Sequence, residues 1–344
     1  MRNEKPVIAA SDKQNFSESE YGILNTLLYF DIFKYPLTKE EIEKYCHSKT
    51  YSSNEINEGL DVLVSKKFIK YSSGFYFVND DYSIVERRIN GNLLAEKFNS
   101  IAKKYSRIIS KFPFVRAVFI SGSLSKGYMD KESDIDYFII TAPGRLWLSR
   151  TLLVLFKKIF LLNSHKYFCV NYFIDENNLE IPDKNIFTAM ELVTLVPMIN
   201  DGLFKKFLGA NTWTGNFFPN VDSLKNKIKE KKRNFPGKSP SDSFKFYSEK
   251  IFSGSIGNKL DDFCLKITLK FWKKKFLHFS EEDFKNALRS KKDVSKHHPN
   301  KFQEKVLGLY VEKINQFEKK HLVSLSPKET IPALLNEVNT SLFQ

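Results

Sequence analysis

Cysteine is scarce in this chain. Only three of its 344 residues are cysteines: Cys46, Cys169 and Cys264. They lie far apart in the sequence, so they form none of the closely spaced ligand pairs of a zinc site. An odd, sparse set of this kind also argues against a disulfide framework. We therefore expect reduced thiols and a cytoplasmic protein.

Long hydrophobic runs are also missing. The most apolar stretch, residues 146–162, is interrupted by Arg150, Lys157 and Lys158, which leaves it well short of a membrane span. We expect a buried helix there. The segment of residues 1–16 is polar and lacks the apolar part of a signal peptide. These features predict no membrane association.

Acidic residues are fewer than basic ones. The chain has 40 Asp and Glu residues against 54 Lys and Arg, which gives a formal net charge of +14. Such a charge attracts nucleic acids and nucleoside triphosphates alike, and it does not choose between them. The content of 42% hydrophobic and 27% charged residues is typical of a globular protein, and the length allows two or three domains.

The most informative stretch is residues 115–141. An apolar strand (residues 115–120) leads to Gly122 and Ser123, where a short polar helix begins, and a second apolar strand follows at residues 135–140. Because glycine lacks a Cβ, a phosphate can approach the backbone there closely. The serine hydroxyl and the free N–H groups of the first helical turn can face the same anion. This stretch therefore predicts a phosphate-binding turn.

Two carboxylates stand at the start of the second strand. Asp134 and Asp136 are two positions apart, so on a strand both project from the same face. Side by side they repel each other unless a cation lies between them. Hard oxygen ligands with open positions suit Mg²⁺ that is shared with a substrate's phosphates. We expect a metal-binding pair facing the phosphate-binding turn.

The Gly122-Ser123 pair, ten intervening residues and an Asp-Ile-Asp triplet resemble the signature of the polymerase-β-like nucleotidyltransferase superfamily. The resemblance implies that Asp134 and Asp136 are catalytic and hold Mg²⁺. It also implies that Gly122 and Ser123 bind the β- and γ-phosphates of a nucleoside triphosphate. Lys126, one turn further on, either adds a positive charge to that phosphate site or is solvated.

Many members of this superfamily carry a third carboxylate on a later strand. Residues 167–174 form the candidate strand by their aromatic and β-branched content, and Asn171 is its polar mid-strand residue. An amide oxygen can bind a metal, but it cannot accept a proton as a carboxylate does. We rank Asn171 first as the third metal ligand. Glu180, on a short partner strand at residues 179–181, ranks second, and Asp175 is the other acidic alternative.

Three capping boxes precede these motifs. Ser17, Thr38 and Ser52 are each followed three residues later by glutamate, which predicts the starts of three helices. Residues 68–80 then read as a hairpin. This order of elements resembles a winged helix-turn-helix.

The third of these helices bears on DNA binding. It exposes a row of acidic residues, namely Glu55, Glu58 and Asp61. Carboxylates that face a phosphate backbone repel it. We therefore expect a docking or dimerising module rather than one that binds DNA.

The fold expected is α+β, with a small mixed-sheet nucleotidyltransferase core. We expect residues 1–17 to be disordered, 18–85 to form the winged-helix-like domain, 86–200 the core and 201–344 a helical C-terminal domain. One predicted helix there, residues 259–276, should turn apolar side chains inward. These side chains are Leu260, Phe263, Cys264, Ile267 and Phe271.

Two functions fit these patterns. The leading hypothesis is an enzyme that uses Mg²⁺ to transfer a nucleoside monophosphate from a nucleoside triphosphate to a hydroxyl group. The acceptor, whether a small molecule, a protein or RNA, is not identified. The alternative is a nucleotidyltransferase fold that binds nucleotide without turnover and acts as a regulatory or antitoxin-like interaction protein. The absence of a clear third carboxylate and the attached winged-helix-like module favour this alternative.

Overall fold

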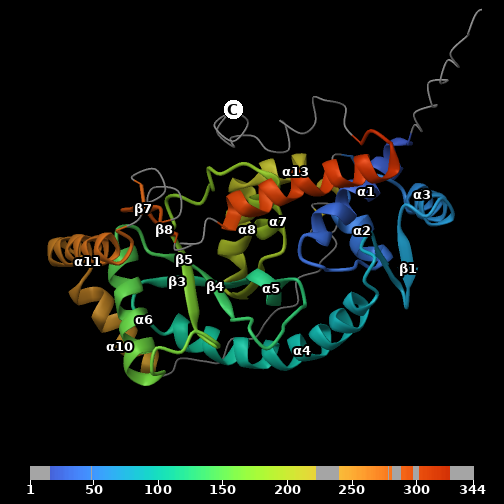
Figure 1. Cartoon of the computed structure of the whole chain (residues 1–344). Coiled ribbons are helices and arrows are strands. Elements are labelled where there is room, and N and C mark those ends of the chain that lie inside the picture. Colours follow the sequence, from blue (N-terminus) through green and yellow to red (C-terminus); the bar gives the residue numbers. More distant parts are fainter. Residues whose placement is uncertain are drawn as a thin grey trace, which may run out of the picture.

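A computed structural model of the chain describes residues 16–47, 49–221, 240–277, 279–280, 288–296 and 302–325. Within these ranges, helices surround a six-stranded mixed sheet, and a separate two-stranded sheet lies in the N-terminal part (Figure 1). A mixed sheet with many helices is consistent with the expected α+β core.

The six-stranded sheet has the order β6-β3-β4-β5-β8-β7. Its strands are β3 (Val115–Ser121), β4 (Asp136–Thr141), β5 (Cys169–Asp175), β6 (Val196–Ile199), β7 (Ser290–Lys291) and β8 (Val294–Lys296). The pair β4–β5 is parallel, and the other neighbours are antiparallel. In this register Ser121 lies opposite Asp136, and Asp136 lies opposite Cys169. The last residue of β3 therefore meets the first residues of β4 and β5 at one end of the sheet.

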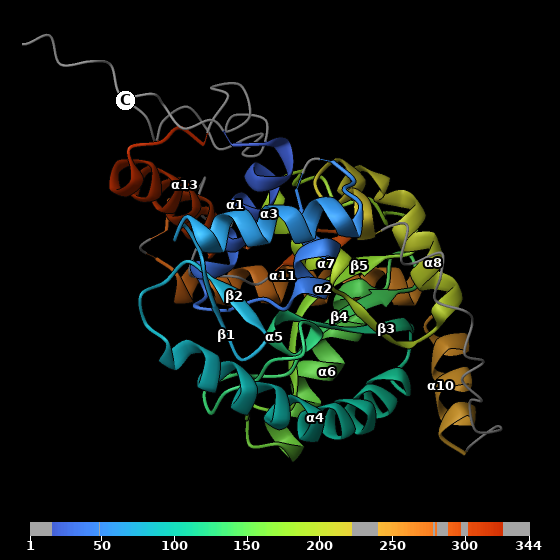
Figure 2. The ribbon, with the colours of Figure 1, turned by 90° about the vertical axis from the view of Figure 1, so that its right-hand side faces the viewer.

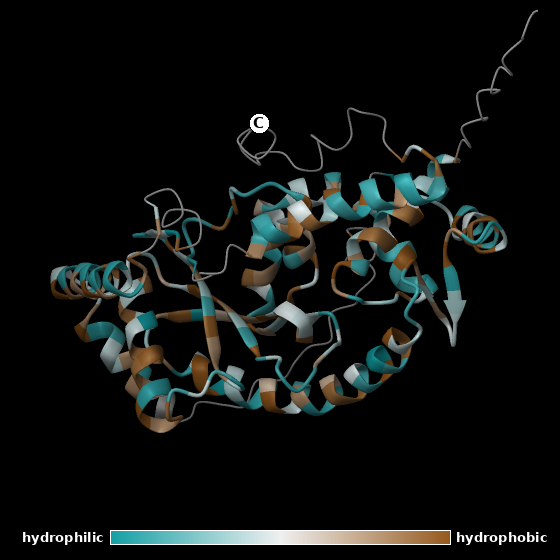
Figure 3. Cartoon of the chain, in the orientation of Figure 1, coloured by the Kyte–Doolittle hydropathy of each residue, from teal (hydrophilic) through white to brown (hydrophobic). Residues whose placement is uncertain are grey.

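Alternating side chains give this sheet two apolar faces. Val118 and Ile120 pack with α4 (Ser83–Ser110), α6 (Leu146–Phe160) and α11 (Ser255–Lys275). Ala117 and Phe119 point to the other face, which α7 (Ile186–Val193) and α8 (Asp201–Ala210) cover. In Figure 1, α4 and α6 lie below the strands and α7 and α8 above them. Apolar and hydrophilic residues alternate along α4, as in an amphipathic helix (Figure 3).

The apolar stretch at residues 146–162 forms α6. Leu146, Trp147 and Leu153 are buried, as expected of a core helix, and the guanidinium of Arg150 lies 4.7 Å from the ring of Trp272 in α11. Among the described residues, no helix is both long enough and apolar enough to cross a bilayer.

The long helix α4 holds the loop that connects β3 to β4. A Cβ at Gly91 would overlap the ring of Tyr128 in that loop. The backbone N–H of Met129 donates a hydrogen bond to the carbonyl oxygen of Gly91 at 3.1 Å. A glycine at this position therefore lets the loop lie directly on the helix.

The N-terminal part contains α1 (Glu18–Asp31), α2 (Lys39–Tyr45) and α3 (Ser53–Ser65), followed by β1 (Lys70–Ser72) and β2 (Phe75–Phe77). All three predicted capping boxes are present, with Ser17, Thr38 and Ser52 as the N-caps. The two strands pair antiparallel. The element order is the one that the sequence predicted, and assignment of these elements to the winged-helix class stays a prediction.

Two features differ from the expected division into domains, one near the N-terminus and one in the C-terminal part. Residues 1–15 of the segment expected to be disordered lie outside the described residues, but Phe16 is described and is buried against Phe68. Helix α13 (Phe302–His321), placed by sequence in a separate C-terminal domain, packs on α1 instead (Figure 2). The rings of Tyr310 and Tyr29 lie 5.5 Å apart there. Apolar residues on one side of α13 complete the core of the N-terminal part.

The C-terminal region is also not wholly helical. Strand β8 pairs with β5, with Lys296 opposite Tyr172, so the region supplies part of the sheet. The partner strand expected at residues 179–181 does not form. Ile181 is buried in a non-strand segment, where its backbone N–H donates to the Asn211 side-chain oxygen at 2.8 Å. Because that side chain satisfies the buried N–H, the segment needs no strand partner.

Helix α11 buries a different side from the one expected. Cys264 is buried, as expected, but so are Asp261 and Trp272. Phe263 and Ile267 are exposed. The buried side is set by α6: Asp261 accepts a hydrogen bond from the backbone N–H of Leu148 at 2.8 Å.

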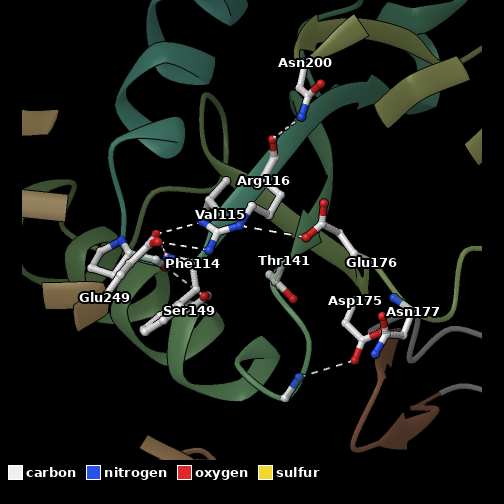
Figure 4. Close-up of polar contacts among 12 residues, drawn as sticks. Phe114, Val115, Arg116, Thr141, Ser149, Asp175, Glu176, Asn177, Asn200 and Glu249 are labelled. Atoms are coloured by element: carbon white, nitrogen blue, oxygen red, sulfur yellow. Dashed lines mark hydrogen bonds and ion pairs between the residues drawn. The ribbon is translucent and has the colours of Figure 1, made fainter. Parts of the chain in front are cut away.

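At the other end of the strands, Arg116 of β3 forms a bidentate ion pair with Glu249 (Figure 4). Its Nη1 and Nη2 atoms lie 2.8 and 2.9 Å from the two carboxylate oxygens. Glu249 belongs to α10 (Pro240–Ile251). The backbone carbonyl of Arg116 accepts from Asn200 at 3.2 Å. This cluster fixes the start of β3. The predicted site lies at the opposite end of the strand.

Candidate nucleotide site

The site forms where β3 ends and β4 begins. Gly122 follows β3 with a φ of +65°, a left-handed conformation that favours glycine. A Cβ at this position would overlap the Oδ2 atom of Asp136, the first residue of β4. The sequence predicted Gly122 as a place for close approach by a phosphate. In the structure the carboxylate of Asp136 occupies the space where a Cβ would lie.

Asn171 reaches the same carboxylate from β5. Its side-chain nitrogen donates a hydrogen bond to Asp136 Oδ1 at 2.8 Å, and its oxygen accepts from the thiol of Cys169 at 3.2 Å. The structure thus places Asn171 beside Asp136. In this arrangement the amide positions the carboxylate, and its oxygen would have to turn away from Cys169 to meet a metal ion.

Burial raises the pKa of Asp136 to about 7. The second cause is the carboxylate of Glu191 on α7, and Asp134 contributes in the same direction. A hydrogen bond to Cys169 and the charge of Lys126 oppose the rise. Three carboxylates thus interact around one buried position. Oxygen donors with this excess of negative charge fit a divalent cation such as Mg²⁺.

Asp134 lies in the turn before β4 and is partly buried. One of its carboxylate oxygens, a ring nitrogen of His165 and the sulfur of Cys169 all lie within 4.8 Å of one another. Asp134 is therefore close enough to Asp136 to affect its pKa, but it faces His165 and Cys169 rather than the cavity described below.

Lys126 does not extend into solvent. Its Nζ atom lies 2.8 Å from Oε1 of Glu191 and 3.2 Å from the carbonyl oxygen of Gly122, and only 17% of its side chain is exposed. Of the two alternatives that the sequence left open, the solvated lysine is not the one the structure shows. The ammonium group already lies against the turn at Gly122.

A cavity of about 570 Å³ joins these groups. The predicted residues that line it are Gly122, Ser123, Lys126, Asp136 and Asn171. Its other walls come from α1 and the residues after it, from the β3–β4 loop, from α7 and from the start of α13, and they include aromatic side chains. These are Tyr29, Phe30, Phe33, Tyr35, Tyr128, Phe187 and Phe302. The N-terminal part of the chain therefore forms one wall of the site.

The acidic alternatives to Asn171 lie elsewhere. Glu180 is exposed and pairs with Lys184 at 2.8 Å. Asp175 is at the far end of β5, where it accepts hydrogen bonds from the backbone N–H groups of Gly144 and Asn177 (Figure 4). Neither residue lines the cavity described above.

Sequence reasoning missed Glu191. It is the one charged residue in the α7 sequence IFTAMELV, and it lines the cavity. A single carboxylate in an otherwise apolar helix is a signal that could have identified it, since a buried charge needs a partner. The resemblance implies a third carboxylate on a later strand, whereas Glu191 lies on a helix.

Comparisons with known proteins agree with the motif. Residues 102–195 match the family model described as a nucleotidyltransferase domain. Neither the curated proteins nor the solved structures gave a significant match to the chain. The matched segment contains β3, β4, β5 and the helix that carries Glu191. It supports the resemblance to polymerase-β-like nucleotidyltransferases and a general function in nucleotidyl transfer.

Proposed function

We propose that this chain transfers a nucleoside monophosphate from a nucleoside triphosphate to a hydroxyl group in a Mg²⁺-dependent reaction. The observation that carries the proposal is the packing of Asp136 on Gly122 in a cavity that the nucleotidyltransferase segment forms together with the N-terminal part and the start of α13. Asp136 and Asn171, which line the cavity, are the residues that would hold the metal, together with Asp134 once its carboxylate turns from His165 and Cys169. Bound Mg²⁺ offsets negative charge on the triphosphate as the transfer proceeds.

The other residues bind and orient the substrate in this proposal. The turn at Gly122 and Ser123 holds the β- and γ-phosphates, and Lys126 supplies a positive charge next to them. The aromatic wall from α1 and α13 borders the remaining space. The acceptor oxygen attacks the α-phosphorus, the bond to the β-phosphate oxygen breaks, and pyrophosphate leaves.

The alternative is a protein that binds nucleotide without turnover and acts in regulation. Its supporting observation is Asn171, an amide that cannot accept a proton, at the β5 position where the resemblance implies a carboxylate. Incubation with radiolabelled triphosphates, Mg²⁺ and cell extract separates the two functions. Label transferred to protein, RNA or a small molecule supports the enzyme, and bound but unreacted triphosphate supports the regulator.

The double variant Asp134→Asn/Asp136→Asn is the control for the metal site. It should keep the fold and lose Mg²⁺-dependent triphosphate binding, as measured by titration calorimetry. Unchanged affinity would overturn the assignment of both residues.

A further inference from the structure

The Lys126–Glu191 ion pair crosses the proposed nucleotide site. Lys126 lies four residues after Gly122, and Glu191 comes from α7, a helix on one face of the sheet. Both residues line the cavity, and their charged atoms are 2.8 Å apart. Their side chains are 17% and 29% exposed, so the pair is only partly screened by water.

Other carboxylates of this cavity already have several hydrogen-bond or ion-pair partners. Asp183 accepts from Arg289 at 2.7 Å and from Lys296 at 3.3 Å. Asp130 holds its own loop through the backbone N–H and the hydroxyl of Ser133. Asp136 packs on Gly122 and accepts from Asn171. Among the described cavity residues, Glu191 is the carboxylate held by a single lysine.

That lysine is also the one that a triphosphate would attract. Its Nζ atom lies 3.2 Å from the carbonyl oxygen of Gly122, at the turn where the phosphates are proposed to bind. Phosphate oxygens there compete with Glu191 for the ammonium group, because a polyphosphate carries more negative charge than one carboxylate. A triphosphate bound there would therefore release Glu191 within the same cavity.

We propose that Glu191 is the general base of the reaction and that binding of the triphosphate breaks its ion pair with Lys126. This inference rests on the proposed function. The free carboxylate takes the proton of the acceptor hydroxyl while the acceptor oxygen forms its bond to the α-phosphorus. Pyrophosphate leaves with the electron pair of the broken P–O bond, and protonated Glu191 later returns its proton to water. The base thus comes from α7, not from β5.

Glu191→Gln tests both parts of the inference. The change removes the negative charge that competes for Lys126, so α,β-methylene analogues of ATP, GTP, CTP or UTP should bind more tightly with Mg²⁺ in a calorimeter. Pyrophosphate release, which reports transfer to any acceptor including water, should fall by about 100-fold or more, the range for loss of a general base. If Glu191 had only a structural role, Glu191→Gln would lower both the analogue affinity and the pyrophosphate release.

Two further variants complete the test. Glu180→Gln makes the same chemical change in an exposed ion pair outside the cavity and should alter neither measurement. Glu191→Ala should recover part of its pyrophosphate release when formate is added, because formate can occupy the vacated space and take the proton. Melting temperatures show that each variant is folded.

The binding and release measurements distinguish failure of the general-base inference from failure of the proposed function. Weaker analogue binding by Glu191→Gln, or retained pyrophosphate release, would overturn the inference while leaving the proposed function in place. If wild-type protein binds the analogues but releases no pyrophosphate, the regulatory alternative holds and the general base is ruled out. If it binds none of them, the proposed function itself fails.

Discussion

The side-chain nitrogen of Asn171 lies 2.8 Å from Oδ1 of Asp136 and donates a hydrogen bond to it. This contact joins two neighbouring parallel strands at the end of the sheet where the nucleotide motif lies. An amide at this position holds the carboxylate in place without adding negative charge. It thereby limits the repulsion in a site that already brings Asp134 and Glu191 close to Asp136.

Asn171→Leu removes this donor and leaves a buried carboxylate oxygen without it. We expect Mg²⁺-dependent nucleotide binding to weaken while the protein stays folded, with a loss of about 1–3 kcal/mol in unfolding free energy. Asn171→Asp should do the opposite for the metal: a higher melting temperature with Mg²⁺ than with EDTA, and tighter Mg²⁺ binding. If Asn171→Asp shows no larger Mg²⁺ effect than wild type, Asn171 is not beside the metal.

Gly122→Ala should displace Asp136, because the added methyl group overlaps its carboxylate. Gly144→Ala is the matched control. Gly144 also has a positive φ, +63°, but a Cβ there meets no described atom within 4 Å. Both changes cost about 1–2 kcal/mol in backbone strain. Calorimetry should show loss of Mg²⁺-dependent nucleotide binding in Gly122→Ala alone, and equal binding by the two variants would contradict the packing of Asp136 on this turn.

Metal binding should depend on pH near neutrality. The pKa of Asp136 is raised to about 7, chiefly by burial. In the folded protein the carboxyl group of Asp136 therefore stays protonated from the ordinary pKa of an aspartate up to about pH 7. As the pH rises through this interval without a bound cation, the carboxyl group ionises and the free energy of unfolding falls. A bound cation needs the carboxylate, so Mg²⁺ affinity at pH 6 should be about tenfold lower than above pH 8. Constant affinity from pH 6 to 8, measured by calorimetry, would contradict this.

Duplex DNA should bind weakly or not at all. Helix α3 exposes Glu55, Glu58 and Asp61, and its buried side faces α1. Fluorescence anisotropy with labelled duplex and the whole chain at physiological salt should give no dissociation constant below about 1 µM, the lower end of non-specific binding. Submicromolar binding that disappears when Lys66 and Lys67 at the end of α3 are changed to glutamine would show that this surface does bind DNA.

Local sequence signals identified much of this molecule. Each capping box has the form of a serine or threonine followed by glutamate three residues later, and all three begin helices where expected. Apolar strands on both sides of the Gly122-Ser123 turn formed β3 and β4. Asn171 was ranked first as the third metal ligand from its polar mid-strand position, and the structure places it beside Asp136.

Long-range contacts could not be predicted in the same way. Strand β8 has only three residues, too few to show an alternating pattern, and its pairing with β5 depends on the fold as a whole. Ile181 looked like part of a strand because it is apolar, but a distant asparagine satisfies its N–H. Glu191 became a candidate only through its ion pair with Lys126, which lies 65 residues away in the sequence.

The packing of α13 on α1 also affects how the protein is made. Roughly 270 residues separate the two helices in the chain, and synthesis proceeds at about 5–20 residues per second. The side of α1 that carries Tyr29 therefore emerges from the ribosome tens of seconds before Tyr310, the ring that covers it. Through that interval the nascent chain exposes the apolar surface of α1 that α13 later covers. Transiently exposed apolar surface of this kind is what chaperones bind during translation.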